Sequence, residues 1–190
     1  MIRNFFPILL VFFSCTILEA QDEINYRPKL LYKALLRENT SVLPGITEIV
    51  IPEAFEGHIY QGKFFETKDN NPAGTIRYIY TGRINSCRTG GCSGDMKKSG
   101  DHDSEYFDYF ILFDAGCKIV QVRVFNYRAT HGQEITAAGW LRQFIGYHGE
   151  SELKTGKNID GISGATISVE GITRDIQDKT QILKELLMIE

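Results

Sequence analysis

Two apolar stretches joined by a short turn constrain the fold of this chain more than any other feature. Residues 106–113 and 118–127 are rich in aromatic and β-branched side chains, and Asp114-Ala115-Gly116 lies between them. Such side chains favour strands, while Asp and Gly favour a tight turn, so the two stretches predict an antiparallel hairpin. Val120, Val122 and Val124 alternate with other residues and are expected on one face of it.

Further strands are expected before the hairpin, and helices on both sides of it. Residues 46–51, 59–67 and 75–83 have strand composition, and residues 28–36, 133–147 and 168–187 show helical periodicity. The expected buried faces are Leu30, Leu31, Ala34 and Leu35 in the first helix, Ile135, Ala138, Leu141 and Ile145 in the second, and Val169, Ile172, Ile176, Leu183 and Leu187 in the third. Strands and helices without regular alternation predict an α+β fold with a largely antiparallel sheet covered by helices.

The first 20 residues have the pattern of a secretory signal peptide. Arg3 precedes an apolar run over residues 5–18, and Leu18-Glu19-Ala20 is a possible cleavage site. A short uncleaved membrane anchor and lipidation at Cys15 remain alternatives. We therefore expect an exported protein, periplasmic or at the outer face of the cytoplasmic membrane. Residues 21–44 are expected as an N-terminal helical segment and residues 45–190 as the main domain.

Residues 85–104 are rich in Gly, Ser, Lys and Asp and predict a long loop within this domain. The loop contains Cys87 and Cys92, and a third cysteine of the mature chain is Cys117. In an oxidising compartment a local Cys87–Cys92 disulfide is the leading hypothesis. Free thiols, or a metal site completed by His102 or Cys117, are the alternatives.

Composition narrows the class of function. A chain of 190 residues, 43% hydrophobic and 24% charged, can bury one core without metal or disulfide support. The net charge of −3 and the lack of a basic cluster with interleaved aromatics argue against a nucleic-acid partner. No Gly-x-Gly-x-x-Gly follows a predicted strand, so NAD is not expected.

The stretch Asp160-Gly161-Ile162-Ser163-Gly164-Ala165-Thr166 points to chemistry. It places the Thr166 hydroxyl on a turn that opens a helix, among small residues that let a bulky group approach the backbone. The unpaired N–H groups of a helix N-terminus suit a phosphate. An ordinary turn with Ser or Thr as a helix cap is the alternative, which spacing alone favours.

These seven residues resemble the Asp-x-x-Ser/Thr-Gly-Ala-Thr attachment motif of the FMN-binding domain family. That family includes the C subunit of the sodium-translocating NADH:quinone oxidoreductase and the G subunit of the Rnf electron-transport complex. The likeness extends over residues 45–187, through the hairpin, the Thr130-His131-Gly132 turn and residues 140–144. It implies FMN bound covalently through a phosphoester to Thr166. Asp160, Ser163, Gly164 and Ala165 would support attachment, and Thr130, His131, Gly132 and Glu134 would lie against the flavin ring.

The resemblance implies a carrier of electrons and not a stand-alone enzyme. Its partners would be a flavin transferase that takes the flavin from FAD, with recognition through Asp160, and redox subunits in a membrane. Two alternatives stay open. The first is a flavin-free or reversibly binding module whose Cys87/Cys92 loop contacts a partner or senses thiol redox state, and the second is a structural accessory of a membrane complex.

Overall fold

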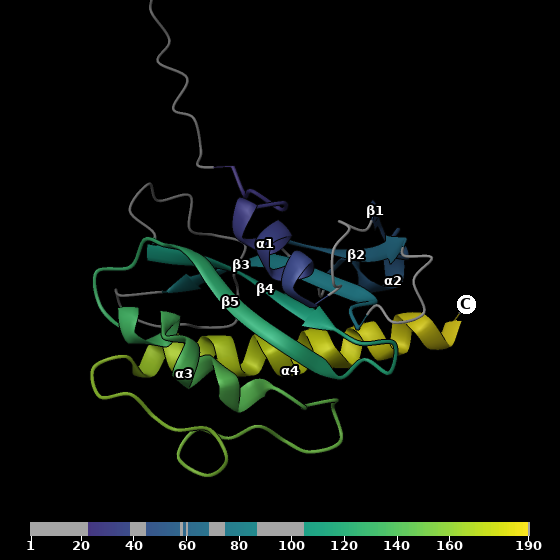
Figure 1. Ribbon diagram of the computed structural model, residues 1–190. Coiled ribbons are helices and arrows are strands. Elements are labelled where there is room, and N and C mark those ends of the chain that lie inside the picture. Colours follow the sequence, from purple (N-terminus) through teal and green to yellow (C-terminus); the bar gives the residue numbers. More distant parts are fainter. Residues whose placement is uncertain are drawn as a thin grey trace, which may run out of the picture.

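The protein is built on one five-stranded antiparallel sheet. The computed structural model describes residues 23–38, 45–57, 59, 61–68, 75–86 and 105–189. The strands pair in sequence order, as β1 (Gly45–Glu48), β2 (Gly62–Lys68), β3 (Tyr78–Ser86), β4 (Glu105–Phe113) and β5 (Ile119–Tyr127). Helix α1 (Lys29–Glu38) covers one face and the long helix α4 (Thr166–Ile189) lies along the other (Figure 1). The expected α+β class is confirmed.

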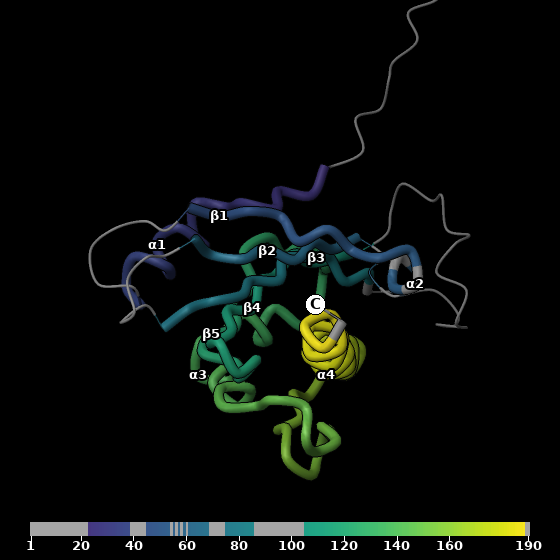
Figure 2. Tube along the Cα trace, turned by 90° about the vertical axis from the view of Figure 1, so that its right-hand side faces the viewer, coloured from purple at the N-terminus to yellow at the C-terminus, as the bar shows by residue number. Residues whose placement is uncertain are grey.

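An end-on view shows the layers directly: the sheet separates α1 from α4, which runs nearly along the line of sight (Figure 2). A short helix, α2 (Glu53–Glu56), connects β1 to β2. The strands fall where the sequence predicted them, with shifted ends. β1 ends at Glu48, before the expected Ile51, and β3 continues to Ser86, so the first two residues of the predicted 85–104 loop are in a strand.

The central hairpin is confirmed, but its face pattern is not. Leu112 pairs with Gln121 and Phe113 with Ile119, so Val120 is the extra residue of a β-bulge. A bulge reverses the alternation of side chains. Val122 and Val124 therefore pack on the α4 face, whereas Val120 packs on the α1 face, contrary to the expectation of one shared face.

Helix α4 is the main cover of the sheet. Val169, Ile172, Ile176 and Leu183 are fully buried, and Leu187 is partly buried against the same core, so the predicted inward face is confirmed. Burial of each such side chain contributes about 1.5–3 kcal/mol. The helix begins at Thr166, two residues before the predicted start.

The predicted helix over residues 133–147 is wrong. Its place is taken by three short turns, η1 (Gln133–Thr136), α3 (Ala138–Leu141) and η2 (Arg142–Phe144). Ala137 is extended, with φ −63° and ψ 122°, and interrupts the helical path. The neighbouring β-branched residues and Gly139 give this segment low helix propensity. Ile135, Leu141 and Phe144 are buried, but Ala138 and Ile145 are exposed.

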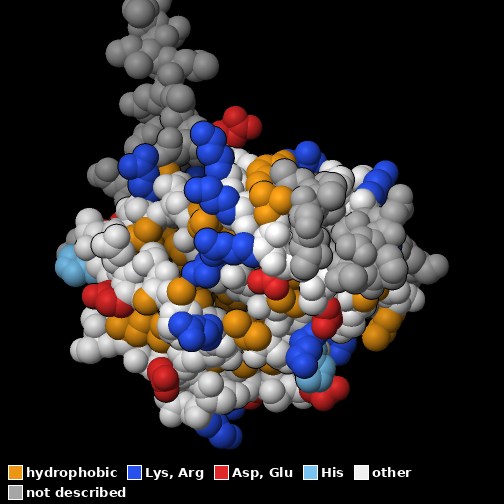
Figure 3. Space-filling model, in the orientation of Figure 1, with side chains coloured by type: hydrophobic (Ala, Val, Ile, Leu, Met, Phe, Trp, Pro, Cys, Tyr) orange, Lys and Arg blue, Asp and Glu red, His pale blue; other side chains and the backbone are white. Residues whose placement is uncertain are grey.

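The α1 face holds a smaller core. Leu31, Ala34 and Leu35 of α1 pack on Phe65, Ile79 and neighbouring sheet residues, while Leu30 is largely exposed. Lys and Arg side chains gather over the α1 and β5 side of the molecule (Figure 3), and Lys29, Lys33 and Arg37 of α1 are exposed.

Several expectations concern residues outside the described ranges. The leader over residues 1–20, with Cys15, and the pair Cys87 and Cys92 belong to this group. Cys117 is described: it is buried beside the hairpin turn, and burial raises the pKa of its thiol.

Candidate functional site

Two segments far apart in the sequence meet where β5 ends and α4 begins. Gly132 lies in the turn after β5 and has φ +86°, a backbone conformation that residues other than glycine rarely adopt. A Cβ atom at this position would lie 3.1 Å from the Cβ atom of Ala165 and 3.1 Å from the Oγ atom of Ser168. The turn after β5 and the first turn of α4 are therefore in contact through a position where only glycine fits.

Tyr127 joins the same two segments. Its hydroxyl donates a hydrogen bond to the backbone oxygen of His131 and lies 3.3 Å from the Oγ atom of Ser168. Its ring stacks on Phe107, with the ring centres 5.6 Å apart. Burial raises the pKa of Tyr127, although the hydrogen bond with Ser168 lowers it. The phenol is thus protonated near neutral pH and serves as a donor to the turn.

Ser168 was the first residue of the predicted last helix, whereas it lies inside α4 and is only 3% exposed. The reason is that α4 starts earlier, at Thr166, so the side chain of Ser168 faces Tyr127 and the core. Sequence reasoning also missed Tyr127, because only the fold brings it to α4.

The predicted site of FMN attachment, residues 160–166, is called the acceptor turn, and it lies at the surface. Ser163, Gly164 and Thr166 are exposed, and Ala165 is buried at 3% exposure. Gly164 has φ +81°, and a Cβ atom there would meet no heavy atom within 4 Å. Thr166 is the first residue of α4, where the N–H groups of the first turn have no partner within the helix. The exposed Thr166 and N–H groups without a partner inside the helix thus share one surface corner.

Two side chains from the α3 region form hydrogen bonds with the backbone of Asp160. The indole Nε1 atom of Trp140 donates to the Asp160 oxygen at 2.9 Å, and the Asp160 N–H donates to the Oε1 atom of Gln143 at 2.7 Å. The Nε2 atom of Gln143 donates in turn to the Trp140 oxygen at 3.0 Å. The sequence did not indicate these contacts, since nothing local links positions 140 and 143 to position 160.

Thr130 is bound to the sheet. Its N–H donates to the Oε1 atom of Glu105 at 3.2 Å, and its hydroxyl donates to the same carboxylate. The Thr130 hydroxyl also lies 2.9 Å from the Nδ1 atom of His131. The N-cap position of η1 is Gly132, without a side-chain cap. Both His131 and Glu134 are exposed.

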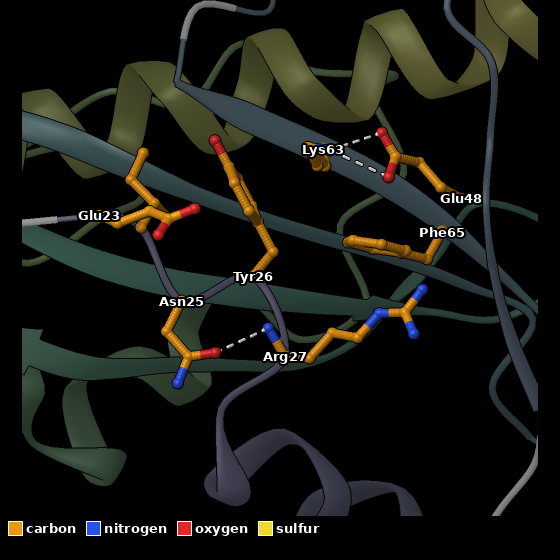
Figure 4. A pocket seen from close by; sticks show the side chains of 8 residues that line it. Glu23, Asn25, Tyr26, Arg27, Glu48, Lys63 and Phe65 are labelled. Atoms are coloured by element: carbon orange, nitrogen blue, oxygen red, sulfur yellow. Dashed lines mark hydrogen bonds and ion pairs between the residues drawn. The ribbon is translucent and has the colours of Figure 1, made fainter.

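The described cavities lie elsewhere, on the α1 face. A recess of about 510 Å³ is lined by the N-terminal residues 23–27 and by Glu48, Lys63 and Phe65. Figure 4 shows Tyr26 and Phe65 beside the Lys63–Glu48 ion pair, whose shortest N–O distance is 2.9 Å. Arg27 stacks on Phe65 at 5.2 Å. Because both cations already have partners, we assign the candidate site to the corner at α4 and not to this recess.

The described ranges hold no group of three or more His, Cys, Asp or Glu side chains arranged to bind a metal ion. Within the same parts of the chain, no helix combines the length and the apolar character needed to cross a membrane.

Comparison with known proteins gives a match over residues 106–181, to the family model described as the FMN-binding domain. The matched range runs from β4 into α4 and so includes both the turn after β5 and the acceptor turn. No curated protein and no solved structure matches the chain. The resemblance seen in the sequence is confirmed by this match.

Proposed function

Residues 106–181 match the FMN-binding domain family, and on that premise we propose that the chain carries FMN as a phosphoester on Thr166. The family supports flavin binding and a role in electron transfer. The attachment site, export and the redox partners are our proposals. The protein would serve as an electron carrier for membrane redox subunits, not as a stand-alone enzyme.

One observation carries the proposal: Thr166 is exposed at the N-terminus of a 24-residue helix, between Ala165 and Ser168, which both lie close to Gly132 in the turn after β5. The helix end supplies N–H donors and a positive dipole for a phosphate. The open space at Gly164 and the close approach of Gly132 to Ala165 support the proposal of a phosphate site next to a surface turn. The residues present therefore fit a phosphate-linked flavin.

The attachment step conserves atoms and electrons. The Oγ atom of Thr166 forms a bond to the phosphorus of the FMN half of FAD and loses its proton. The pyrophosphate bond of FAD breaks, and AMP leaves with that electron pair. No atom changes oxidation state, so a flavin transferase and FAD suffice.

The remaining site residues would hold and orient the group. Ser163 and the first-turn amides would donate hydrogen bonds to the phosphate, and Asp160 would be recognised by the transferase. Thr130, His131, Gly132 and Glu134 would line the ring, with the backbone of this turn fixed by Tyr127. When bound, FMN supplies a ring that accepts and releases electrons.

Export is supported by the sequence of residues 1–20, whose pattern is that of a signal peptide or short anchor. A covalent bond suits such a location, because a dissociable cofactor would be lost by dilution outside the cytoplasm. Membrane association and redox subunits as partners are proposed from the resemblance to the family.

The test is intact-protein mass spectrometry after co-expression with a flavin transferase. We expect the wild-type protein to gain one FMN phosphoester, Thr166→Ala to gain none, and Thr166→Ser to retain it. Ser163→Ala removes the other exposed hydroxyl of the same turn. It should keep the added mass but gain it more slowly, because a donor to the phosphate is lost. A colourless wild-type protein would contradict the proposal and favour the flavin-free module. Loss of the added mass in Ser163→Ala alone would move the attachment point.

A further inference from the structure

We propose that Gln143 and Trp140 are positioning residues of the FMN acceptor site. They fix the backbone of Asp160 so that a flavin transferase meets its carboxylate and the Thr166 hydroxyl in one defined arrangement. This inference rests on the proposed function and adds how the acceptor turn is made recognisable.

The two side chains bind both polar backbone groups of Asp160. Trp140 donates to its oxygen at 2.9 Å and Gln143 accepts from its N–H at 2.7 Å. The third bond, from Gln143 to the Trp140 oxygen at 3.0 Å, ties the two gripping residues together. The indole is itself fixed by an edge-on contact with buried Phe144, at 5.4 Å between ring centres. Trp140, which packs partly buried against the core, thus connects the exposed Asp160 to it.

These two hydrogen bonds involve only the backbone of Asp160, so its carboxylate can still contact a partner. Asp160 is exposed, and its carboxylate makes no hydrogen bond or ion pair with the described residues. Its backbone is already bound, so the side chain is the part that a partner can reach.

The turn needs such an anchor because it is otherwise weakly restrained. Between Asp160 and α4 the chain passes through Gly161 and Gly164, both exposed. The next restraints are the partial packing of Ile162 against the core and the hydrogen bond from the Ala165 N–H to the Ile162 oxygen, at 3.1 Å. Glycine-rich backbone loses much conformational entropy on ordering. A transferase that had to order an unrestrained turn would therefore bind the protein with lower affinity.

The chain contains a matched control. At the other end of the same connection, the Oε1 atom of Gln177 accepts a hydrogen bond from the Leu153 N–H at 2.7 Å. Gln177 and Gln143 are both partly buried glutamines that bind one backbone N–H. Only Gln143 does so at the acceptor turn.

The experiment measures FMN transfer from FAD to the apo full-length chain by a flavin transferase, at several acceptor concentrations. We expect Gln143→Ala and Trp140→Phe each to lower kcat/KM for the acceptor about three- to tenfold, as for loss of one hydrogen bond, mainly through a higher KM. Gln143→Glu keeps the accepting oxygen and should recover part of the rate. Gln177→Ala should transfer as the wild type does. Exchange of the Asp160 amide hydrogen should quicken in Gln143→Ala and not in Gln177→Ala.

Wild-type transfer rates and unchanged Asp160 exchange in Gln143→Ala would overturn the inference, even with Thr166 modified. Equal slowing by Gln177→Ala would also overturn it, since general loosening of the connection would then be the cause. Failure of the wild-type chain to accept FMN is a separate result that removes the proposed function itself.

Discussion

The two faces of the sheet are covered in different ways. Among the described residues, the α4 face buries a cluster of twenty residues, and the α1 face buries eight. The α4 face also carries the acceptor turn and the turn after β5, whereas the α1 face carries the described recesses and many of the exposed basic side chains (Figure 3).

This difference separates the proposed flavin site from the two recesses of the α1 face. A covalently held group does not need a deep pocket, because the bond itself retains it. It needs a rigid corner whose donors stay in place, and rigid support comes from the larger core. We therefore expect changes on the α1 face to affect stability alone, and changes at the corner to affect flavin attachment as well.

The largest effect should come from Asp108, which lies on the α1 face of the sheet. It is 1% exposed, and it accepts hydrogen bonds from Arg83 at 2.6 and 3.0 Å and from Asn126 at 2.8 Å. Asp108→Ala leaves buried Arg83 without this carboxylate and should lower the free energy of unfolding by about 3–5 kcal/mol. Urea unfolding measures this.

The control is Glu66→Ala, which breaks the exposed Arg77–Glu66 pair. It should change stability by about 1 kcal/mol or less. Folded Asp108→Ala protein should still take up FMN. Loss of attachment in the folded variant would break the division between the two faces.

Truncations of buried aliphatic side chains compare the two cores directly. Ile176 on α4 and Leu35 on α1 are both fully buried. Each change to Ala should cost about 2–5 kcal/mol, and the loss at Ile176 should be the larger because the bigger cluster around it can collapse less. Chemical denaturation of both variants decides this. A greater loss for Leu35→Ala would reverse the proposed order of the faces.

Gly132→Ala tests the contact between the turn after β5 and α4. The alanine would have to keep the left-handed backbone conformation of Gly132. Its Cβ atom would lie 3.0–3.1 Å from side-chain atoms of Tyr127, Ala165 and Ser168. We expect a cost of about 1–3 kcal/mol and a changed flavin absorption spectrum in the loaded protein. Gly139→Ala is the control, since its Cβ atom would meet nothing within 4 Å. It should be neutral or stabilise by roughly 0.5–1 kcal/mol. Equal effects of the two changes would exclude a special fit at Gly132.

Alkaline pH should weaken the α4 face, with little effect near neutrality. Burial, and secondarily the negative charge of Asp175, raise the pKa of Tyr109 well above its ordinary value of 10. Above pH 10 the unfolded chain therefore loses this proton while the folded chain keeps it. The contribution of Tyr109 to the free energy of unfolding is therefore fully present below pH 10 and falls as the pH rises further. Unfolding curves from pH 8 to 11 should fall less steeply for Tyr109→Phe than for the wild type. Parallel curves would rule out this contribution.

Part of the fold could be predicted because local patterns determine it. The hairpin follows from strand composition around Asp114, whose Oδ1 atom accepts from the N–H groups of Gly116 and Lys118 at 2.8 and 2.9 Å. The buried face of α4 follows from 3.6-residue periodicity. The segment 133–147 could not be predicted in this way, because its apolar spacing fits a helix while tertiary contacts favour three short turns.

The candidate site divides similarly. The acceptor turn and the turn after β5 could each be recognised from Gly, Ser and Thr residues at short spacing. Tyr127, Glu105 and Gln143 could not, because each acts on residues that only folding brings near.

The sequence by itself determined the strands, the long C-terminal helix and the residue types of the acceptor turn, since these depend on neighbours a few positions apart. Only the tertiary structure decided that Gly132 meets Ala165, that Val120 turns to the other face and that Gln143 grips Asp160. Those features depend on contacts across tens of residues, where packing and hydrogen-bond geometry in the folded chain select one arrangement among many.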